Sequence, residues 1–174
     1  MVKKLKPGDQ APELKGNPVN TGGKFDLKEK FSNKPVLVVF SRYFGCPVCQ
    51  SDFDKLLEIK DKVKQKAELV YITQSSEDSI QEFIKDREGV EFPILSDPEK
   101  PFPMYESWKI GNITMITIAK MAKVVIGSKY KHGEYEGHEK QSPADFLVGT
   151  DGNLLHVNYS LFNSKKILKI LDSL

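Results

Sequence analysis

Two cysteines, Cys46 and Cys49, stand three positions apart in the segment Cys-Pro-Val-Cys, and they are the only cysteines of the chain. The apolar run 35–40 precedes them and predicts a buried strand, because it leaves no polar face. Apolar residues recur at helical spacing after them, which predicts a helix over about 47–65. Both thiols are therefore expected at a strand-to-helix turn, with Pro47 near the first helical position. Free N–H groups and the positive end of the helix dipole favour thiolate there, so the spacing predicts sulfur chemistry.

A metal site is the alternative role for this cysteine pair. A disulfide within Cys-x-x-Cys closes too small a loop to add much stability, so the pair is expected to serve either chemistry or a metal. Half of a zinc site would need two more ligands. His132 and His138 could supply them, but they lie farther from Cys49 than the ligands of a compact zinc finger. The position at a helix start favours redox chemistry over zinc, and no metal or other cofactor is expected.

The composition points to an ordinary globular protein. The 174 residues are 39% apolar and 29% charged, which is typical of a soluble chain with one sizeable core. We expect a single domain over residues 1–174. The net charge of +2 is too small to indicate a nucleic-acid partner. The chain starts without the apolar core of a signal peptide, and no apolar run reaches membrane-spanning length. A cytoplasmic protein with neither a nucleic-acid nor a membrane partner is expected.

The helix over 47–65 is expected to connect two parallel strands, at 35–41 and 69–73. Turn and cap residues divide the rest of the chain. Before this unit, a short helix capped by Asp26 is expected at 25–31. After it, a helix is expected to follow Ser75–Ser79, then a strand at 92–95 and a rigid proline loop at 98–103, against which Tyr105 and Trp108 pack. The chain is expected to continue with a hairpin of strands at 145–149 and 154–159 and a helix from Ser164.

A helix over 113–126 has a different pattern. Polar residues recur at every third position, and almost everything between them is apolar. This narrow polar stripe predicts a helix that is mostly buried within the monomer, with partial burial in a dimer interface as the alternative. The following residues, 129–141, are polar and punctuated by glycine, which predicts a mobile loop.

Several segments, spread over nearly the whole chain, together match one pattern: 7–12, 40–49, 76–83, 92–97 and 146–152. On these segments the sequence is similar to the alkyl hydroperoxide reductase/thiol-specific antioxidant superfamily, the peroxiredoxins. On the segments 42–49 and 141–146 it is most similar to peroxiredoxin-like proteins with a C-P-x-C site. The resemblance implies a thioredoxin-like α/β fold with a central mixed β-sheet flanked by helices on both faces, and thiol chemistry.

The resemblance leaves two assignments of the cysteines open. In peroxiredoxins the peroxide-reacting cysteine falls nine residues after the strand phenylalanine, which makes it Cys49 when counted from Phe40. In thioredoxins the first cysteine of the pair is the nucleophile because it is the more exposed, which points to Cys46. Pro143 stands where peroxiredoxins usually carry an arginine and where thioredoxins carry a cis-proline, so we expect a cis peptide bond there. Arg42 is the nearby cation that could replace the arginine.

The expected function is the reduction of hydroperoxides by the cysteine pair. Cys49 would attack the peroxide, Cys46 would resolve the resulting sulfenic acid as a disulfide bond, and Arg42 would polarise the thiolate and the peroxide. An external thiol reductant, such as a thioredoxin-like protein, would reopen the disulfide. The expected substrate-binding positions around the pair are Pro143, Phe44 and Pro47.

Two alternative functions remain. One is a thioredoxin-like protein disulfide oxidoreductase, in which Cys46 attacks and the backbone of Pro143 docks the partner. The other is a non-enzymatic module that binds zinc or a partner protein on the same fold. Both redox functions require the thiols to lie within reach of each other and of an outside oxidant. A homodimer is a further expectation for the assembly.

Overall fold

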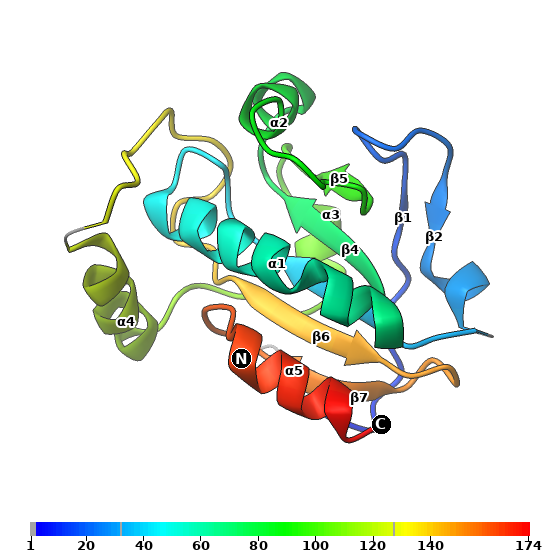
Figure 1. The fold of residues 1–174 in the computed structure, drawn as a ribbon. Coiled ribbons are helices and arrows are strands. Elements are labelled where there is room, and N and C mark those ends of the chain that lie inside the picture. Colours follow the sequence, from blue (N-terminus) through cyan, green and yellow to red (C-terminus); the bar gives the residue numbers. More distant parts are fainter. Residues whose placement is uncertain (1–2, 32, 127) are drawn as a thin grey trace.

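The computed structural model describes residues 3–31, 33–126 and 128–174, and its centre is a five-stranded mixed sheet (Figure 1). The strand order is β5-β4-β3-β6-β7, with β3 parallel to β4 and antiparallel to β6. All five residues of the central strand β3 are buried, as its unbroken apolar run predicts. The strands are β3 (Val36–Phe40), β4 (Glu68–Thr73), β5 (Ile94–Ser96), β6 (Ala144–Val148) and β7 (Leu154–Asn158).

Helices cover both faces of this sheet. Helices α1 (Pro47–Lys66) and α5 (Ser164–Asp172) lie on one face, and the short helix α3 (Pro103–Ser107) lies on the other (Figure 1). Helix α2 (Glu77–Ile84) follows β4, and α4 (Met115–Val125) lies beside the N-terminal end of α1. The predicted thioredoxin-like arrangement, a mixed sheet with helices on both faces, is confirmed.

The N-terminal part of the chain forms a small separate sheet. Strands β1 (Lys15–Gly16) and β2 (Phe25–Asp26) pair antiparallel, and a 3₁₀ helix, η1 (Leu27–Lys30), follows. The Asp26 side chain accepts a hydrogen bond from the backbone N–H of Lys28, which caps this turn as predicted.

Two apolar layers sandwich the central sheet. On one face, Phe53 of α1 is fully buried and packs edge-on against Tyr71 of β4, with 5.0 Å between ring centroids. On the opposite face, Trp108 lies 5.5 Å from Phe40 and 4.8 Å from Phe146 between ring centroids. Full burial of one such side chain stabilises the fold by about 1.5–3 kcal/mol. The two layers hold the end of β3, and the loop that follows it, in a fixed position.

The prediction that the helix over 113–126 is buried in the monomer is wrong. The helix forms as α4, but Met115, Ile116 and Ile126 are 80%, 71% and 80% exposed. Its inward side instead carries Thr117 and Met121, which are four positions apart and share one face. Thr117 belongs to the predicted polar stripe, and it is tolerated inside because its hydroxyl hydrogen-bonds that of Thr114 at 3.0 Å. Partial burial of α4 in a dimer interface stays a prediction.

Two smaller expectations also need correction. The strand expected at 92–95 begins at Ile94, although Phe92 is buried beside it. The proline loop leads directly into α3, because Pro103 occupies its first position. Tyr105 and Trp108 lie in the central core, where Tyr105 also packs on Phe102 of the proline loop with 6.5 Å between ring centroids. No helix within the described ranges is long and apolar enough to cross a membrane.

Candidate active site

The cysteine pair occupies the N-terminal end of α1. Cys46 is the N-cap residue, Pro47 takes the first helical position as predicted, and Cys49 lies in the first turn. The loop between β3 and α1 is tied to the end of β4, where the carbonyl oxygen of Arg42 accepts hydrogen bonds from Gln74 N at 2.6 Å and Thr73 Oγ1 at 3.0 Å. The loop geometry is therefore fixed by the sheet.

The side chain of Arg42 turns inward to the thiols. Its Nη2 lies 2.6 Å from Cys46 Sγ, and its Nη1 donates a 2.6 Å hydrogen bond to the carbonyl oxygen of Glu139. Burial acts to lower the pKa of Arg42, but negative charge at Cys49 and Cys46 raises it above its usual value. A buried guanidinium thus faces the cysteine pair as a permanent positive charge.

The two thiols are electrostatically coupled. Burial acts to raise the pKa of Cys49, but a hydrogen bond from Cys46 and the charge of Arg42 outweigh it and lower the pKa to about 5. The same hydrogen bond, together with burial, raises the pKa of Cys46. The pair therefore shares one proton, which stays on Cys46 and leaves the negative charge on Cys49.

Both thiols are covered, contrary to the expectation that an outside oxidant reaches them directly. Cys46 and Cys49 are 2% and 3% exposed, so the first cysteine is not the more accessible one. They belong to a small apolar cluster with Tyr43, Val48 and Met121, the last of which comes from α4. Access to the sulfur atoms thus requires movement of the groups that pack over them.

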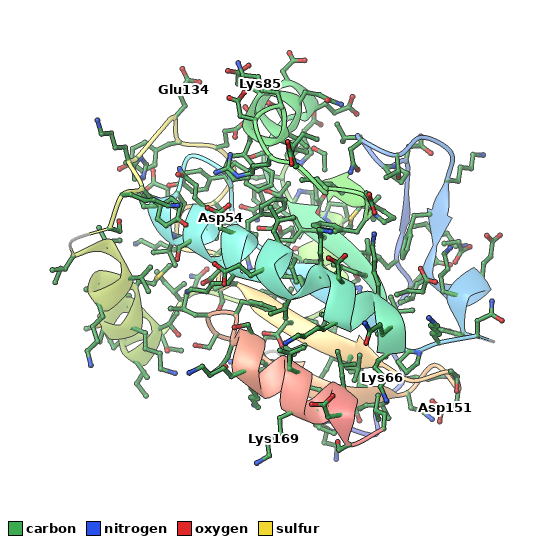
Figure 2. The ribbon with its side chains drawn as sticks, in the orientation of Figure 1. Asp54, Lys66, Lys85, Glu134, Asp151 and Lys169 are labelled. Carbon is green, nitrogen blue, oxygen red and sulfur yellow. The ribbon has the colours of Figure 1, made fainter. Side chains whose placement is uncertain are left out.

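Residues 129–141, which we name the strap, provide another part of this cover. The strap is irregular, as predicted for a loop, and in Figure 1 it passes in yellow beside the N-terminal end of α1. The backbone N–H of Gly133 donates to the carbonyl oxygen of Gly45 at 2.8 Å. A Cβ atom on Gly45 would lie only 2.1 Å from the carbonyl oxygen of Glu134, so the close approach requires glycine. The side chain of Glu134 itself points outward from the strap (Figure 2).

Side chains of the strap are also engaged with the body of the protein. Glu136 accepts hydrogen bonds from the backbone N–H of Ser76 and from the hydroxyl of Ser79. Burial acts to raise the pKa of Glu136, but hydrogen bonds from these serines outweigh it and lower the pKa. The backbone N–H of His138 donates to Gln74 Oε1 at 2.8 Å. These contacts connect the strap to the N-terminus of α2 and to the end of β4.

The histidines proposed as zinc ligands do not join the cysteines. His132 Nε2 lies 3.2 Å from the hydroxyl of Tyr43, and His138 Nε2 lies 2.9 Å from Asn112 Oδ1. Within the residues that the structure describes, no group of three or more His, Cys, Asp or Glu side chains is placed to hold a metal ion.

The three expected substrate-binding residues lie around the pair in different settings. Pro143 lines a small cavity against Cys49, but its peptide bond is trans, and the cis bond of the described chain is Lys100–Pro101. The expectation of a cis bond at Pro143 is therefore wrong. Phe44 is buried and stacks on Phe83 with 3.9 Å between ring centroids. Pro47 is buried at the start of α1.

Three residues near Cys49 were not anticipated from the sequence. Ser41, Asp52 and Tyr71 line the same cavity as Cys49. Burial raises the pKa of Asp52 to about 6, although Lys55 opposes the shift. Asp52 follows Cys49 by three positions on one helix face, and Tyr71 lies two positions after Leu69 on the face of β4 that packs against α1, so spacing alone could have suggested both.

Comparison with known proteins places this geometry in context. Residues 7–157 match the sequence model of the AhpC/TSA family. The Bos taurus protein named Peroxiredoxin-like 2C is 25% identical over 178 residues, covering 92% of this chain and 74% of that protein. A reduced 2-Cys peroxiredoxin from Plasmodium vivax superposes with a TM-score of 0.71 and 18% identity, covering 95% of this chain and 80% of the other. A DsbF homologue from Corynebacterium diphtheriae superposes with a TM-score of 0.64 and 20% identity, covering 99% of this chain and 92% of the other. Both superpositions show a shared fold.

Proposed function

The chain belongs to the AhpC/TSA family, and from this premise we propose that it reduces hydroperoxides through the Cys46–Cys49 pair. Membership supports a peroxiredoxin-like thiol peroxidase or thiol–disulfide oxidoreductase. The observation that carries the peroxidase assignment is the buried guanidinium of Arg42, whose Nη2 lies 2.6 Å from Cys46 Sγ at the N-terminal end of α1. A positive charge in a site that excludes water stabilises both the thiolate and the charge that develops on a peroxide oxygen.

In the proposed first step, the Cys49 thiolate attacks one oxygen of the hydroperoxide. A sulfur–oxygen bond forms and the O–O bond breaks. The second oxygen leaves as an alkoxide or hydroxide and takes up a proton from solvent to give an alcohol or water, and the sulfur of Cys49 is oxidised by two electrons to a sulfenic acid. Cys49 takes this role because the shared proton stays on Cys46.

In the proposed second step, Cys46 attacks the sulfur of the Cys49 sulfenic acid. The disulfide bond forms, the sulfur–oxygen bond breaks, and the oxygen leaves as water with the proton of Cys46. An external thiol reductant, such as a thioredoxin-like protein, then reduces the Cys46–Cys49 disulfide. The homodimer and the cytoplasmic location expected from the sequence stay predictions.

Single cysteine variants test the order of attack. Cys46→Ser treated with one equivalent of hydrogen peroxide is expected to accumulate a sulfenic acid on Cys49, visible by mass spectrometry after trapping with dimedone. Cys49→Ser, its matched control, is expected to consume no peroxide above background. Peroxide consumption that is retained in Cys49→Ser and absent from Cys46→Ser would contradict the assignment.

One observation favours a second candidate, a thiol–disulfide oxidoreductase that uses Cys46 as nucleophile. Arg42 Nη2 contacts Cys46 Sγ directly, and this contact would stabilise a thiolate on the first cysteine once the shared proton moves to Cys49. Reduction of insulin disulfides that is lost in Cys46→Ser, together with no turnover of peroxide by the unmodified protein, would select this function over the peroxidase.

A further inference from the structure

A small cavity borders Cys49 on a side that the other thiol does not share. Ser41, Tyr71 and Met121 are among its lining residues, whereas Cys46 is not. The centre of a water molecule could move through about 10 Å³ of this space, which is room for about one water-sized group. The cavity is therefore large enough for a single oxygen atom with its hydrogens, and too small for an organic substrate.

The hydroxyl of Tyr71 is a spare hydrogen-bond donor in this cavity. Tyr71 is 1% exposed, and its hydroxyl oxygen has no hydrogen-bond partner within the described part of the chain. The ring is fixed between neighbours, with Phe53 at 5.0 Å edge-on and Phe44 at 5.8 Å stacked. A buried hydroxyl without a partner destabilises a fold, so an unpaired one calls for an explanation.

The electrostatic surroundings keep this hydroxyl protonated and close to the sulfur chemistry. Burial, followed by negative charge at Cys49, raises the pKa of Tyr71 well above its usual value. The Ser41 side chain approaches the Tyr71 hydroxyl closely enough to oppose this rise in pKa, but not with the geometry of a full hydrogen bond. A hydrogen bond from Ser41 also acts to lower the pKa of Cys49. Ser41 and Tyr71 thus face the same thiol, and Tyr71 stays a neutral donor.

The chemistry of disulfide formation defines where an oxygen must go. When one sulfur displaces oxygen from another, the entering sulfur, the central sulfur and the leaving oxygen lie close to one line. With Cys46 entering at Cys49, the leaving oxygen points away from Cys46. A site for this oxygen must therefore border Cys49 and not Cys46, as the cavity does.

We propose that this cavity is the leaving-oxygen site of the disulfide-forming step, in which the Tyr71 hydroxyl donates a hydrogen bond to the oxygen of the Cys49 sulfenic acid. The oxygen departs with the proton of Cys46 as one water molecule, while the sulfur–oxygen bond breaks and the Cys46–Cys49 bond forms. A donor fixed in a buried site stabilises the negative charge that develops on the oxygen as it leaves. The inference rests on the proposed function, because it requires that peroxide oxidises Cys49.

The test compares Tyr71→Phe with the unmodified protein in a single turnover with hydrogen peroxide. Tyr71→Phe removes only an unpaired hydroxyl, so the variant is expected to fold and to melt at the same or a higher temperature. Rapid quenching and mass spectrometry then follow the sulfenic acid and the disulfide separately. Formation of the sulfenic acid is expected to stay within about twofold, whereas its conversion to the disulfide is expected to slow by about 10- to 100-fold, the usual effect of one hydrogen bond to a charged group.

A slower second step should also leave the sulfenic acid exposed to more peroxide. Tyr71→Phe is therefore expected to accumulate sulfinic acid on Cys49 at peroxide concentrations that leave the unmodified protein intact. The matched control is Tyr159→Phe, which removes a hydroxyl that donates to the carbonyl oxygen of Trp108 in the apolar layer on the other face of the sheet. The rates of sulfenic acid formation and of disulfide formation are both expected to be unchanged in this variant.

The possible results separate the two proposals. An unchanged rate of disulfide formation in Tyr71→Phe overturns the leaving-oxygen site and leaves the proposed function intact. Equal slowing of both steps also overturns it, because the hydroxyl would then act on attack rather than on departure of oxygen. Absence of any sulfenic acid on Cys49 in Cys46→Ser overturns the proposed function itself.

Discussion

Arg42 and Cys46 are four residues apart in the chain, and the guanidinium Nη2 of the first lies 2.6 Å from the Sγ of the second. The contact crosses the turn that joins β3 to α1 and is not made by a regular helix. It holds because the carbonyl oxygen of the same arginine is fixed to the end of β4. Sheet geometry thus determines how close the positive charge comes to the thiols.

Arg42→Met is expected to raise the pKa of the reactive thiol by roughly 1–3 units, the usual effect of losing an adjacent opposite charge. The rate of reaction with peroxide at neutral pH should fall with the thiolate fraction. The measurement is the pH dependence of iodoacetamide alkylation in both proteins. Arg87→Met is the control, because Arg87 pairs with Asp54 and packs on Phe83 away from the thiols. An unchanged alkylation profile in Arg42→Met would remove Arg42 from the mechanism.

The reduced protein is expected to become more stable as the pH rises from about 6 to about 9. The pKa of Cys49 is about 5 in the folded state against an ordinary 9.0, so the unfolded chain binds more protons in this window and the free energy of unfolding rises with pH. Below about pH 6, Asp52 acts in the opposite direction, since burial raises its pKa from 3.8 to about 6. Above about pH 9, the raised pKa of Cys46 reverses the trend.

Urea unfolding in the presence of reductant, repeated across this pH window, measures the effect. Cys49→Ser lacks the titrating thiol, so its stability should vary much less with pH. Parallel pH dependence in the two proteins would show that Cys49 is not a thiolate in the folded state.

Met121→Ala is expected to uncover the cysteine pair. Met121 is 8% exposed and packs in the same cluster as both thiols, so its truncation should destabilise the protein by roughly 2 kcal/mol or more and accelerate reaction with a bulky aromatic disulfide reagent. Met115→Ala on the same helix is the control, because Met115 is 80% exposed. Met115→Ala should change the free energy of unfolding by less than about 0.5 kcal/mol and leave the rate of reaction with the disulfide reagent unaltered. Equal rates in the two variants would mean that α4 does not control access.

Gly45→Ala is expected to displace the strap. The new Cβ would lie 2.1 Å from the carbonyl oxygen of Glu134, so one of the two backbone segments has to move. The expected results are a lower melting temperature and faster proteolysis within residues 129–141. Gly111→Ala is the matched control, since a Cβ at Gly111 meets nothing within 4 Å. If the strap is cleaved by protease at the same rate in both variants, the strap is not held against Gly45 as the structure shows.

The sequence was sufficient for the parts of the site that depend on local signals. The unbroken apolar run of β3, the proline at the first position of α1 and the helical spacing after it are all short-range features. They locate the cysteines at a strand-to-helix turn without any knowledge of the neighbours. The hairpin of β6 and β7 could likewise be predicted from the sequence, because Asp151 and Gly152 strongly favour a tight turn.

Other features depend on contacts between distant segments and could not be read in this way. The periodicity of α4 showed that one stripe is polar, but it could not show that the Thr117 position faces inward. The trans peptide bond at Pro143 and the cover over both thiols likewise depend on tertiary packing. The cavity at Cys49 is formed where β3, β4 and α1 meet α4 and the segment before β6, so no single stretch of sequence signals it.

Trp108, the single tryptophan of the chain, lies in the apolar layer on the face of the sheet opposite Cys49. Its fluorescence should therefore report the loss of the folded core during denaturation while remaining insensitive to the oxidation state of the thiols. One sample could be followed by emission for unfolding and by gel shift for redox state, and the two signals would not interfere.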